Sequence, residues 1–219
     1  MGTLNLAVLI SGRGSNLKAL LTACADPDFP SRVALVVSDN ADAAGLGHAD
    51  TFGVPRTVIE RGAYSDRGAF EAALDAAIRA RNVDLICLAG FMRLLSESFV
   101  RRWWNRIVNI HPSLLPAFPG LDTHERALAS GVRLSGCTVH IVRPAMDDGP
   151  ILVQAAVPVL PDDTGQTLAD RILIAEHEAY PLAVRLLAER RVEIVDERVL
   201  FADATLAARF GPESILRVP

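Results

Sequence analysis

The sequence predicts an α/β protein: a doubly wound, mostly parallel sheet with helices on both faces, followed by an antiparallel C-terminal portion. In the first half of the chain, short continuous apolar runs alternate with stretches of helical periodicity. Strands buried on both faces of a parallel sheet have such continuous runs. In the second half, two longer strand-like segments are separated by a short turn, which favours an antiparallel pair.

The expected elements follow in order along the chain. In the first half, strands are expected at 4–10, 32–37, 55–59, 83–89 and 106–110, and helices at 17–25, 41–52, 65–81 and 96–103, the last capped by Ser96. Right-handed crossovers should connect the parallel strands. In the second half, a proline-rich loop precedes a helix at 123–130, and strands are expected at 136–142 and 151–160. A long helix at 164–190, which Pro181 should kink or split, and a hairpin from residue 192 complete the chain.

The composition excludes several classes of protein. The 219 residues carry 22 basic and 26 acidic side chains, and 50% of them are apolar, which is typical of a globular protein rather than a disordered one. A net charge of −4 gives no basic surface for nucleic acid or an anionic membrane. No apolar run approaches the ~18 residues of a membrane span, and no signal peptide is recognisable. Three cysteines without a CxxC pair suit a reducing compartment, so we expect a cytoplasmic protein.

A glycine-containing loop, SGRGSN, follows the first expected strand and precedes the first expected helix. Such a loop lets the backbone approach a ligand closely, and the helix N-terminus offers unpaired N–H groups to an anion. The motif is neither a Walker loop nor a GxGxxG fingerprint. Two interpretations of the motif are about equally supported. It is either a phosphate-binding site or a tight turn in which Ser15 or Asn16 caps the helix.

Asn109 and His111 stand at the end of a buried strand with one residue between them, so both side chains should leave on the same face. Histidine exchanges protons near neutral pH, and an asparagine amide can stabilise an oxyanion. A structural histidine in a proline-rich turn is the alternative interpretation. His140 lies in an apolar strand and is expected to be a core histidine. The MDDGP turn contains a carboxylate that can approach His111, although an ordinary hydrated turn is the alternative interpretation. The five histidines do not show the spacing typical of a metalloenzyme.

Together these motifs resemble one family. AVLISGRGSNL, LAGFMRLL, VNIHPSLLPAFPGLDTH, GCTVH, MDDGP, ILVQAAVPV and AEHEAYP occur in an order similar to that of the folate-dependent phosphoribosylglycinamide formyltransferases of purine synthesis. The resemblance covers most of the chain, from about residue 6 to 181. It implies the formyltransferase fold and transfer of a formyl group from 10-formyltetrahydrofolate, as co-substrate, to the glycine amine of glycinamide ribonucleotide.

The resemblance also implies the site residues. The family's catalytic residues fall on Asn109, His111 and Asp147, and its ribonucleotide contacts on Gly14, Ser15, Asn16 and Glu176. Its folate contacts fall on Arg67, Met92, Arg93, Leu94, Leu95, Asn109, Arg143, Pro144, Ala145, Met146 and Asp147. The sequence departs from the family pattern at Arg13, Asp122 and Asp148, and Asp148 leaves two candidates for the working carboxylate.

The resemblance implies one domain with three parts: a Rossmann-like nucleotide-binding half at 1–110, a folate and catalytic half at 111–190, and a hairpin and tail at 191–219. We expect small-molecule substrates, no metal, no nucleic acid and no membrane, and the resemblance allows a weak homodimer. The alternatives are other users of 10-formyltetrahydrofolate, a deformylase or a methionyl-tRNA formyltransferase relative. A binding module without activity is a further alternative. The presence of Asn109, His111 and Asp147 together argues against it.

Overall fold

A computed structural model describes residues 3–202 of the chain. Seven strands form one sheet in the order β3-β2-β1-β4-β5-β6-β7. The strands are β1 (Leu4–Ile10), β2 (Ser31–Ser38), β3 (Arg56–Val58), β4 (Leu85–Leu88), β5 (Ile107–His111), β6 (Leu134–Ile141) and β7 (Ile151–Pro158). The helices are α1 (Ser15–Cys24), α2 (Leu46–Thr51), α3 (Arg67–Arg79), α4 (Glu97–Arg102), α5 (Thr123–Ala129) and α6 (Gly165–Ala188), with a 3-10 turn at Arg61–Ala63.

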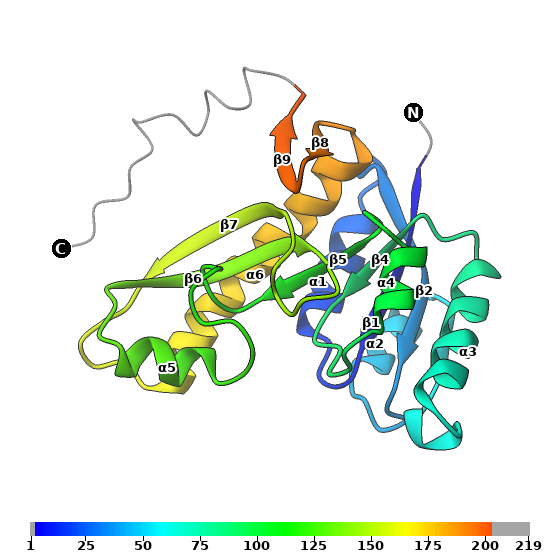
Figure 1. The fold of residues 1–219 in the computed structure, drawn as a ribbon, viewed down its shortest axis with the longest axis horizontal. Coiled ribbons are helices and arrows are strands. Elements are labelled where there is room, and N and C mark those ends of the chain that lie inside the picture. Colours follow the sequence, from blue (N-terminus) through cyan, green and yellow to red (C-terminus); the bar gives the residue numbers. More distant parts are fainter. Residues whose placement is uncertain (1–2, 203–219) are drawn as a thin grey trace.

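The direction of the strands divides the sheet into two portions. β1 to β5 pair in parallel, whereas β6 is antiparallel to both β5 and β7. In Figure 1 the long β6–β7 pair extends away from the parallel portion, with α5 and α6 beside it. The predicted fold class, a mostly parallel sheet with an antiparallel C-terminal portion, is confirmed.

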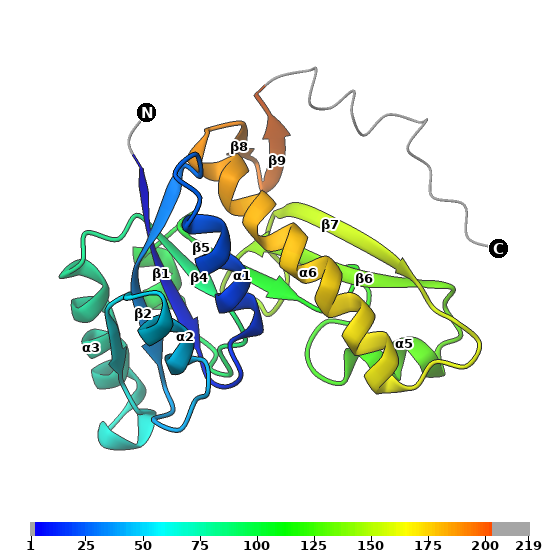
Figure 2. The ribbon, with the colours of Figure 1, turned by 180° about the vertical axis from the view of Figure 1, so that it is seen from behind.

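Helices cover both faces of the sheet. The buried side chains of β1 alternate between two apolar clusters: Leu6, Val8 and Ile10 pack with α1, α2 and α6, while Ala7 and Leu9 pack with α3 and α4. The two sets of helices lie on opposite sides in Figures 1 and 2. This alternation follows from the period of two in a strand, and it explains why β1 is apolar at almost every position.

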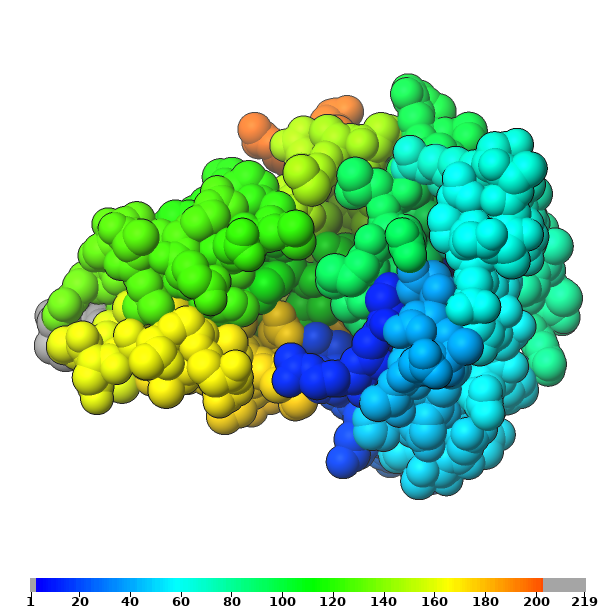
Figure 3. Space-filling model, turned by 90° about the horizontal axis from the view of Figure 1, so that it is seen from below, coloured from blue at the N-terminus to red at the C-terminus, as the bar shows by residue number. Residues whose placement is uncertain are grey.

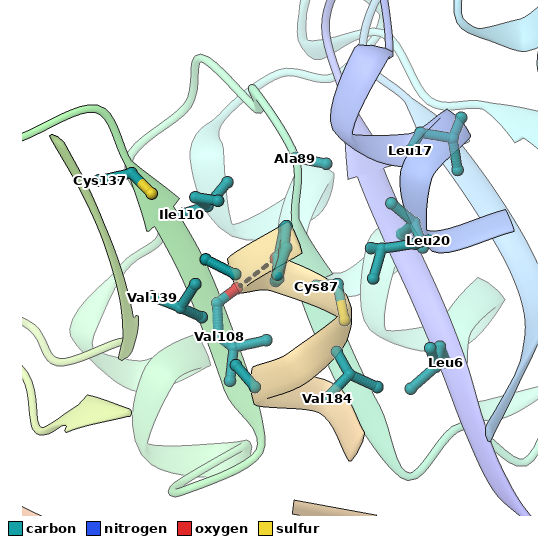
Figure 4. Packing of buried hydrophobic residues seen from close by; sticks show 14 of the residues in the cluster. Leu6, Leu17, Leu20, Cys87, Ala89, Val108, Ile110, Cys137, Val139 and Val184 are labelled. Atoms are coloured by element: carbon teal, nitrogen blue, oxygen red, sulfur yellow. Dashed lines mark hydrogen bonds between the residues drawn. The ribbon is translucent and has the colours of Figure 1, made fainter. Parts of the chain in front are cut away.

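Helix α6 runs unbroken through Pro181, so of the two expected effects, a kink or a split, the split does not occur. Proline removes one backbone hydrogen bond, but packing compensates for this loss because both halves of the helix lie against the sheet. Beside the proline, the buried Tyr180 hydroxyl donates to the carbonyls of Leu88 and Val108, at 2.9 and 3.2 Å. Figure 4 shows how Val184 of α6 and Leu17 and Leu20 of α1 face the strands of the parallel portion.

Helix α2 is shorter than the expected helix at 41–52. The residues before it form turns instead: the Asn40 side chain accepts from the Asp42 N–H at 3.0 Å, and the Ala43 N–H donates to the Asn40 carbonyl. The Gly45 N–H donates to Gly12 across the loop after β1. Local side-chain hydrogen bonds of this kind compete with the helix despite the alanine content.

The C-terminal hairpin is formed by β8 (Val192–Val195) and β9 (Arg198–Phe201), which pair antiparallel. The rest of the predicted tail, from residue 203, lies outside the described residues. Within residues 3–202, no helix has the length and apolar character needed to cross a membrane.

Candidate active site

The loops after β1 and β4 meet at the carboxyl ends of these neighbouring strands. The Ser11 N–H donates to the Gly90 carbonyl at 3.1 Å, and the Met92 N–H donates to the Ser11 hydroxyl at 2.8 Å. From β1 the chain continues to β2 and β3 on one side, whereas β4 and β5 lie on the other, so this is the topological switch point of the sheet. Open α/β sheets bind ligands at this position.

The SGRGSN loop ends at the N-terminus of α1, with Gly14 as the N-cap at a φ of 72°. A Cβ on Gly14 would lie 2.7 Å from the Cα of Gly45, so both the conformation and the space require glycine. No side chain caps α1, so the interpretation of Ser15 or Asn16 as a helix cap is wrong. The first N–H groups of the helix therefore stay free to bind an anion.

The loop is joined to α6 by a buried hydrogen bond from the Asn16 Nδ2 to the Glu176 Oε2, at 2.7 Å. These residues are 160 positions apart in the chain. The space-filling view shows the dark blue chain after β1 lying against α6, at the edge of a hollow between the two ends of the molecule (Figure 3). Burial raises the pKa of Glu176, and the Asn16 hydrogen bond partly counteracts this shift.

Replacing Glu176 with glutamine should stabilise the protein increasingly as the pH rises. The native state holds the Glu176 proton more tightly than the unfolded chain, so wild-type stability falls between the ordinary glutamate pKa of about 4.3 and the raised value. Glutamine does not titrate and can still accept the Asn16 bond. Thermal melts of Glu176→Gln across this interval should show a growing Tm difference from wild type. The exposed Glu178→Gln on the same helix is the matched control, and equal slopes for both variants would contradict the expectation.

A second group of polar side chains gathers at the end of β5. Asn109 pairs across the β5–β6 ladder with His140, and the Asn109 Nδ2 lies 3.3 Å from the His140 Nε2. The His140 Nδ1 lies 3.0 Å from the Ile141 carbonyl, which only accepts, so Nδ1 carries the proton of the neutral ring. Burial lowers the pKa of His140, which keeps it neutral. Its Nε2 therefore accepts one Asn109 N–H and leaves the second available.

His111 is held by the loop that follows it. Its Nε2 lies 3.0 Å from the Phe118 carbonyl and therefore donates to it, and its Nδ1 lies 3.5 Å from the Asp147 Oδ2. Only 8% of the His111 side chain is exposed. Protonation of Nδ1 would give the ring a second N–H that faces the carboxylate.

Asp147 has a positive φ of 55° in the turn between β6 and β7. Its Oδ2 accepts from the Gly120 N–H at 2.8 Å, and its Oδ1 lies 3.8 Å from the His140 Nε2. The turn is tight, because a Cβ on Gly149 would lie 1.7 Å from the Ile141 carbonyl oxygen. The neighbouring Asp148 is exposed. The carboxylate beside the two histidines is therefore that of Asp147.

The structure thus brings Asn109, His111 and Asp147 together and adds His140 as a fourth member. Sequence reasoning expected a core histidine at position 140, and the residue is indeed buried. In the sequence it is only a histidine within an apolar strand, and the register of β5 against β6 is what places its ring opposite Asn109.

The predicted folate residues near β4 border a separate cavity of about 350 Å³. It is lined by Arg61, Arg67, Phe70, Met92, Arg93 and Leu94. The Arg67 guanidinium donates to the Leu94 carbonyl and to Glu71, and the Arg93 Nε donates to Asp39 at 2.5 Å. Met92 and Leu94 are exposed, whereas Leu95 is half-buried. Three guanidinium groups around one cavity suit an anionic ligand.

In the turn after β6, the residues of the predicted folate loop differ in their environment. The Arg143 side chain is buried against Asn105 and Glu197, whereas Pro144, Ala145 and Met146 are exposed. Among residues 3–202, no group of three or more His, Cys, Asp or Glu side chains is arranged to hold a metal ion.

The chain is similar to many known proteins, of which three illustrate the relationship. A crystal structure of glycinamide ribonucleotide transformylase 1 from Symbiobacterium toebii is 51% identical, with a TM-score of 0.89 and coverage of 92% of this chain and 95% of that one. Phosphoribosylglycinamide formyltransferase of Escherichia coli is 40% identical over 87% of this chain and 90% of its own length.

The trifunctional purine biosynthetic protein adenosine-3 of Bos taurus is 46% identical over 86% of this chain. The chain spans only about a fifth of that longer protein, 19% of its length. The formyl transferase family matches residues 4–184, which include every predicted site residue. The chain belongs to the formyl transferase family.

Proposed function

We propose that this enzyme transfers the formyl group of 10-formyltetrahydrofolate to the glycine amine of glycinamide ribonucleotide, giving formylglycinamide ribonucleotide and tetrahydrofolate. The observation that carries the proposal is the convergence of Asn109, His111 and Asp147 at the carboxyl end of β5. The proteins named above as relatives add support, since two are named for this transfer. A cytoplasmic location and weak self-association stay predictions.

The proposed reaction needs stabilisation of an oxyanion and movement of one proton. The neutral amine attacks the formyl carbon, so a C–N bond forms and the carbonyl oxygen gains negative charge. The free Asn109 N–H is the donor for this oxygen, and a His111 ring that takes up a proton at Nδ1 adds positive charge beside it. As the tetrahedral intermediate collapses, the bond to the folate nitrogen breaks. The proton lost by the amine reaches that nitrogen directly or through a water held by Asp147.

The ribonucleotide is assigned to the crevice at the switch point. The backbone N–H groups of Gly14, Ser15 and Asn16 suit its phosphate, because they open α1 without a side-chain cap. We assign the ribose hydroxyls to Glu176 as their acceptor, which the hydrogen bond from Asn16 joins to the same loop. Both substrates would then meet at His111, and holding them together removes much of the entropic barrier.

The folate is assigned to the exposed loops around β4 and β6. Met92 and Leu94 on one side and Met146 on the other offer apolar surface for a flat ring system. The arginine-lined cavity with Arg61, Arg67 and Arg93 suits the carboxylates of the folate's glutamate tail.

A transfer assay tests the proposal directly. The purified protein is mixed with 10-formyltetrahydrofolate and glycinamide ribonucleotide, and formylated ribonucleotide is quantified. Parallel reactions contain water alone or initiator methionyl-tRNA as the acceptor. Turnover only with the ribonucleotide is the expected result. Formate release without an acceptor would indicate a deformylase, and folate binding without any turnover would indicate a binding module.

Replacing Asn16 with alanine should raise the KM for the ribonucleotide by about tenfold while changing the KM for the folate little. The change removes a donor from the loop and leaves the buried Glu176 without its partner. Steady-state kinetics with each substrate varied in turn measures the effect. A rise confined to the folate KM would show that the phosphate site has been assigned wrongly.

A further inference from the structure

The β8–β9 hairpin lies beyond residue 184, where the match to the family ends. Its two turn residues, Asp196 and Glu197, have φ values of 48° and 59°, as a two-residue hairpin of type I′ requires. This turn directs the Glu197 carboxylate onto Arg143, at the start of the segment 142–150 that carries Asp147.

Arg143 is held on several sides at once. Its Nε and Nη2 donate to the two carboxylate oxygens of Glu197, at 2.6 and 3.2 Å, and Nη2 also donates to the Asn105 Oδ1 at 2.7 Å. Nη1 donates to the Val142 carbonyl, and the guanidinium carbon lies 3.9 Å from the centre of the Trp104 ring. Only 6% of the Arg143 side chain is exposed.

This pair differs from Arg56–Asp50 and Arg101–Glu97, in which both side chains are exposed. Glu197 itself is 58% exposed, but the charge that it neutralises is buried, and the contact is bidentate. Exposed pairs contribute little because water screens both charges, whereas a buried guanidinium without its carboxylate is strongly unfavourable. Removing Glu197 should therefore release Arg143 from its position.

A short stretch of chain connects Arg143 to the carboxylate of Asp147, so a displacement of Arg143 should also move Asp147. Between Arg143 and Asp147, the residues Pro144, Ala145 and Met146 are exposed. At the far end of the segment, the Pro150 carbonyl accepts from the Ile141 N–H at 2.9 Å. At the near end, the Val142 N–H donates to the Ile107 carbonyl at 2.8 Å, and the anchored guanidinium adds a side-chain constraint between this bond and the turn at Asp147.

We propose that Glu197 is a positioning residue for formyl transfer: through Arg143 it fixes segment 142–150 and holds Asp147 beside His111 and His140. The kinetic part of this proposal rests on the proposed function, whereas its structural part does not. The hairpin is then a working part of the active site, although it supplies no group that touches substrate.

Hydrogen exchange of the free protein tests the structural part. In Glu197→Ala, the Gly120 N–H, which donates to Asp147, and the hydrogen-bonded N–H groups of Ile141 and Val142 should exchange about tenfold faster than in wild type, since a local constraint has been lost. Glu193→Ala is the matched control, because Glu193 is an exposed glutamate of the same hairpin. Equal exchange in wild type and Glu197→Ala overturns the proposal, whatever the enzyme's substrate.

Kinetics tests the second part. Glu197→Ala should raise the folate KM and lower kcat, each by about fivefold or more, and leave the ribonucleotide KM within about twofold, because misplacement of one loop affects only the groups it carries. Adding Glu197→Ala to Arg143→Met should have little further effect. Wild-type constants combined with a lower Tm would make the pair merely structural and overturn the proposal.

If Glu197→Ala does not fold, Glu197→Gln is used instead, since it keeps the size and one acceptor oxygen but loses the charge and the second acceptor. The same exchange and kinetic outcomes then decide. A wild-type protein that does not formylate the ribonucleotide refutes the proposed function alone, and the exchange experiment still decides the role of Glu197.

Discussion

Replacing His111 with alanine should lower kcat for formyl transfer by about 10²-fold or more, the usual contribution of a positioned acid or base. The change removes the ring whose Nδ1 faces Asp147 and whose Nε2 is fixed by Phe118. Single-turnover kinetics at saturating substrates measures the loss in the chemical step, free of product release.

Two control measurements show that the His111→Ala variant still binds its substrate and still folds. His111 is not among the residues proposed to bind the ribonucleotide, so the Kd of the ribonucleotide should change by no more than about twofold, and thermal melts should show a cooperative transition. A variant that keeps near-normal kcat would remove His111 from the mechanism and leave the structural interpretation of this histidine.

Replacing Asp147 with asparagine should lower kcat by a similar factor, about 10²-fold. Asparagine keeps the size of the side chain and an oxygen that can accept from Gly120, but it loses the charge next to the His111 Nδ1. A proton on the His111 Nδ1 would then lose its anionic partner, and the water proposed to relay the amine proton would lose the carboxylate that holds it. The pH dependence of kcat should change together with its magnitude.

Asp148→Asn is the matched control, because Asp148 is adjacent in sequence, identical in type and exposed. It should leave kcat within about twofold of wild type, as surface substitutions usually do. If Asp148→Asn caused the larger loss, the working carboxylate would have been assigned to the wrong member of the MDDGP pair.

The parts of the fold that are local in sequence were predictable. Continuous apolar runs identify β1, β4 and β5, and the Ser96 cap identifies the start of α4, where the side chain accepts from the Phe99 N–H. The shortened α2 was not predictable, because its first residues form turns that involve Gly12 on another loop. Propensity alone does not include such tertiary contacts.

The site was predictable where neighbouring residues share a strand end and not where distant residues meet. Asn109 and His111 could be paired from their spacing alone. The resemblance supplied Glu176, whose bond to Asn16 links segments that are far apart. The role of His140 depends on the β5–β6 register, and the Arg143–Glu197 contact depends on where a hairpin folds back. Neither leaves a pattern that can be read along the chain.

The face-to-face pairing of Asn109 with His140 restricts how the chain can vary in length. Because side chains alternate along a strand, inserting or deleting one residue inside β5 or β6 would turn one partner to the opposite side of the sheet. Viable indels should therefore accumulate in connections that hold no residue of the site, and spare these two strands. Engineering of a different acceptor specificity should therefore change the connecting loops, because the β5–β6 pairing sets the spacing of the polar groups.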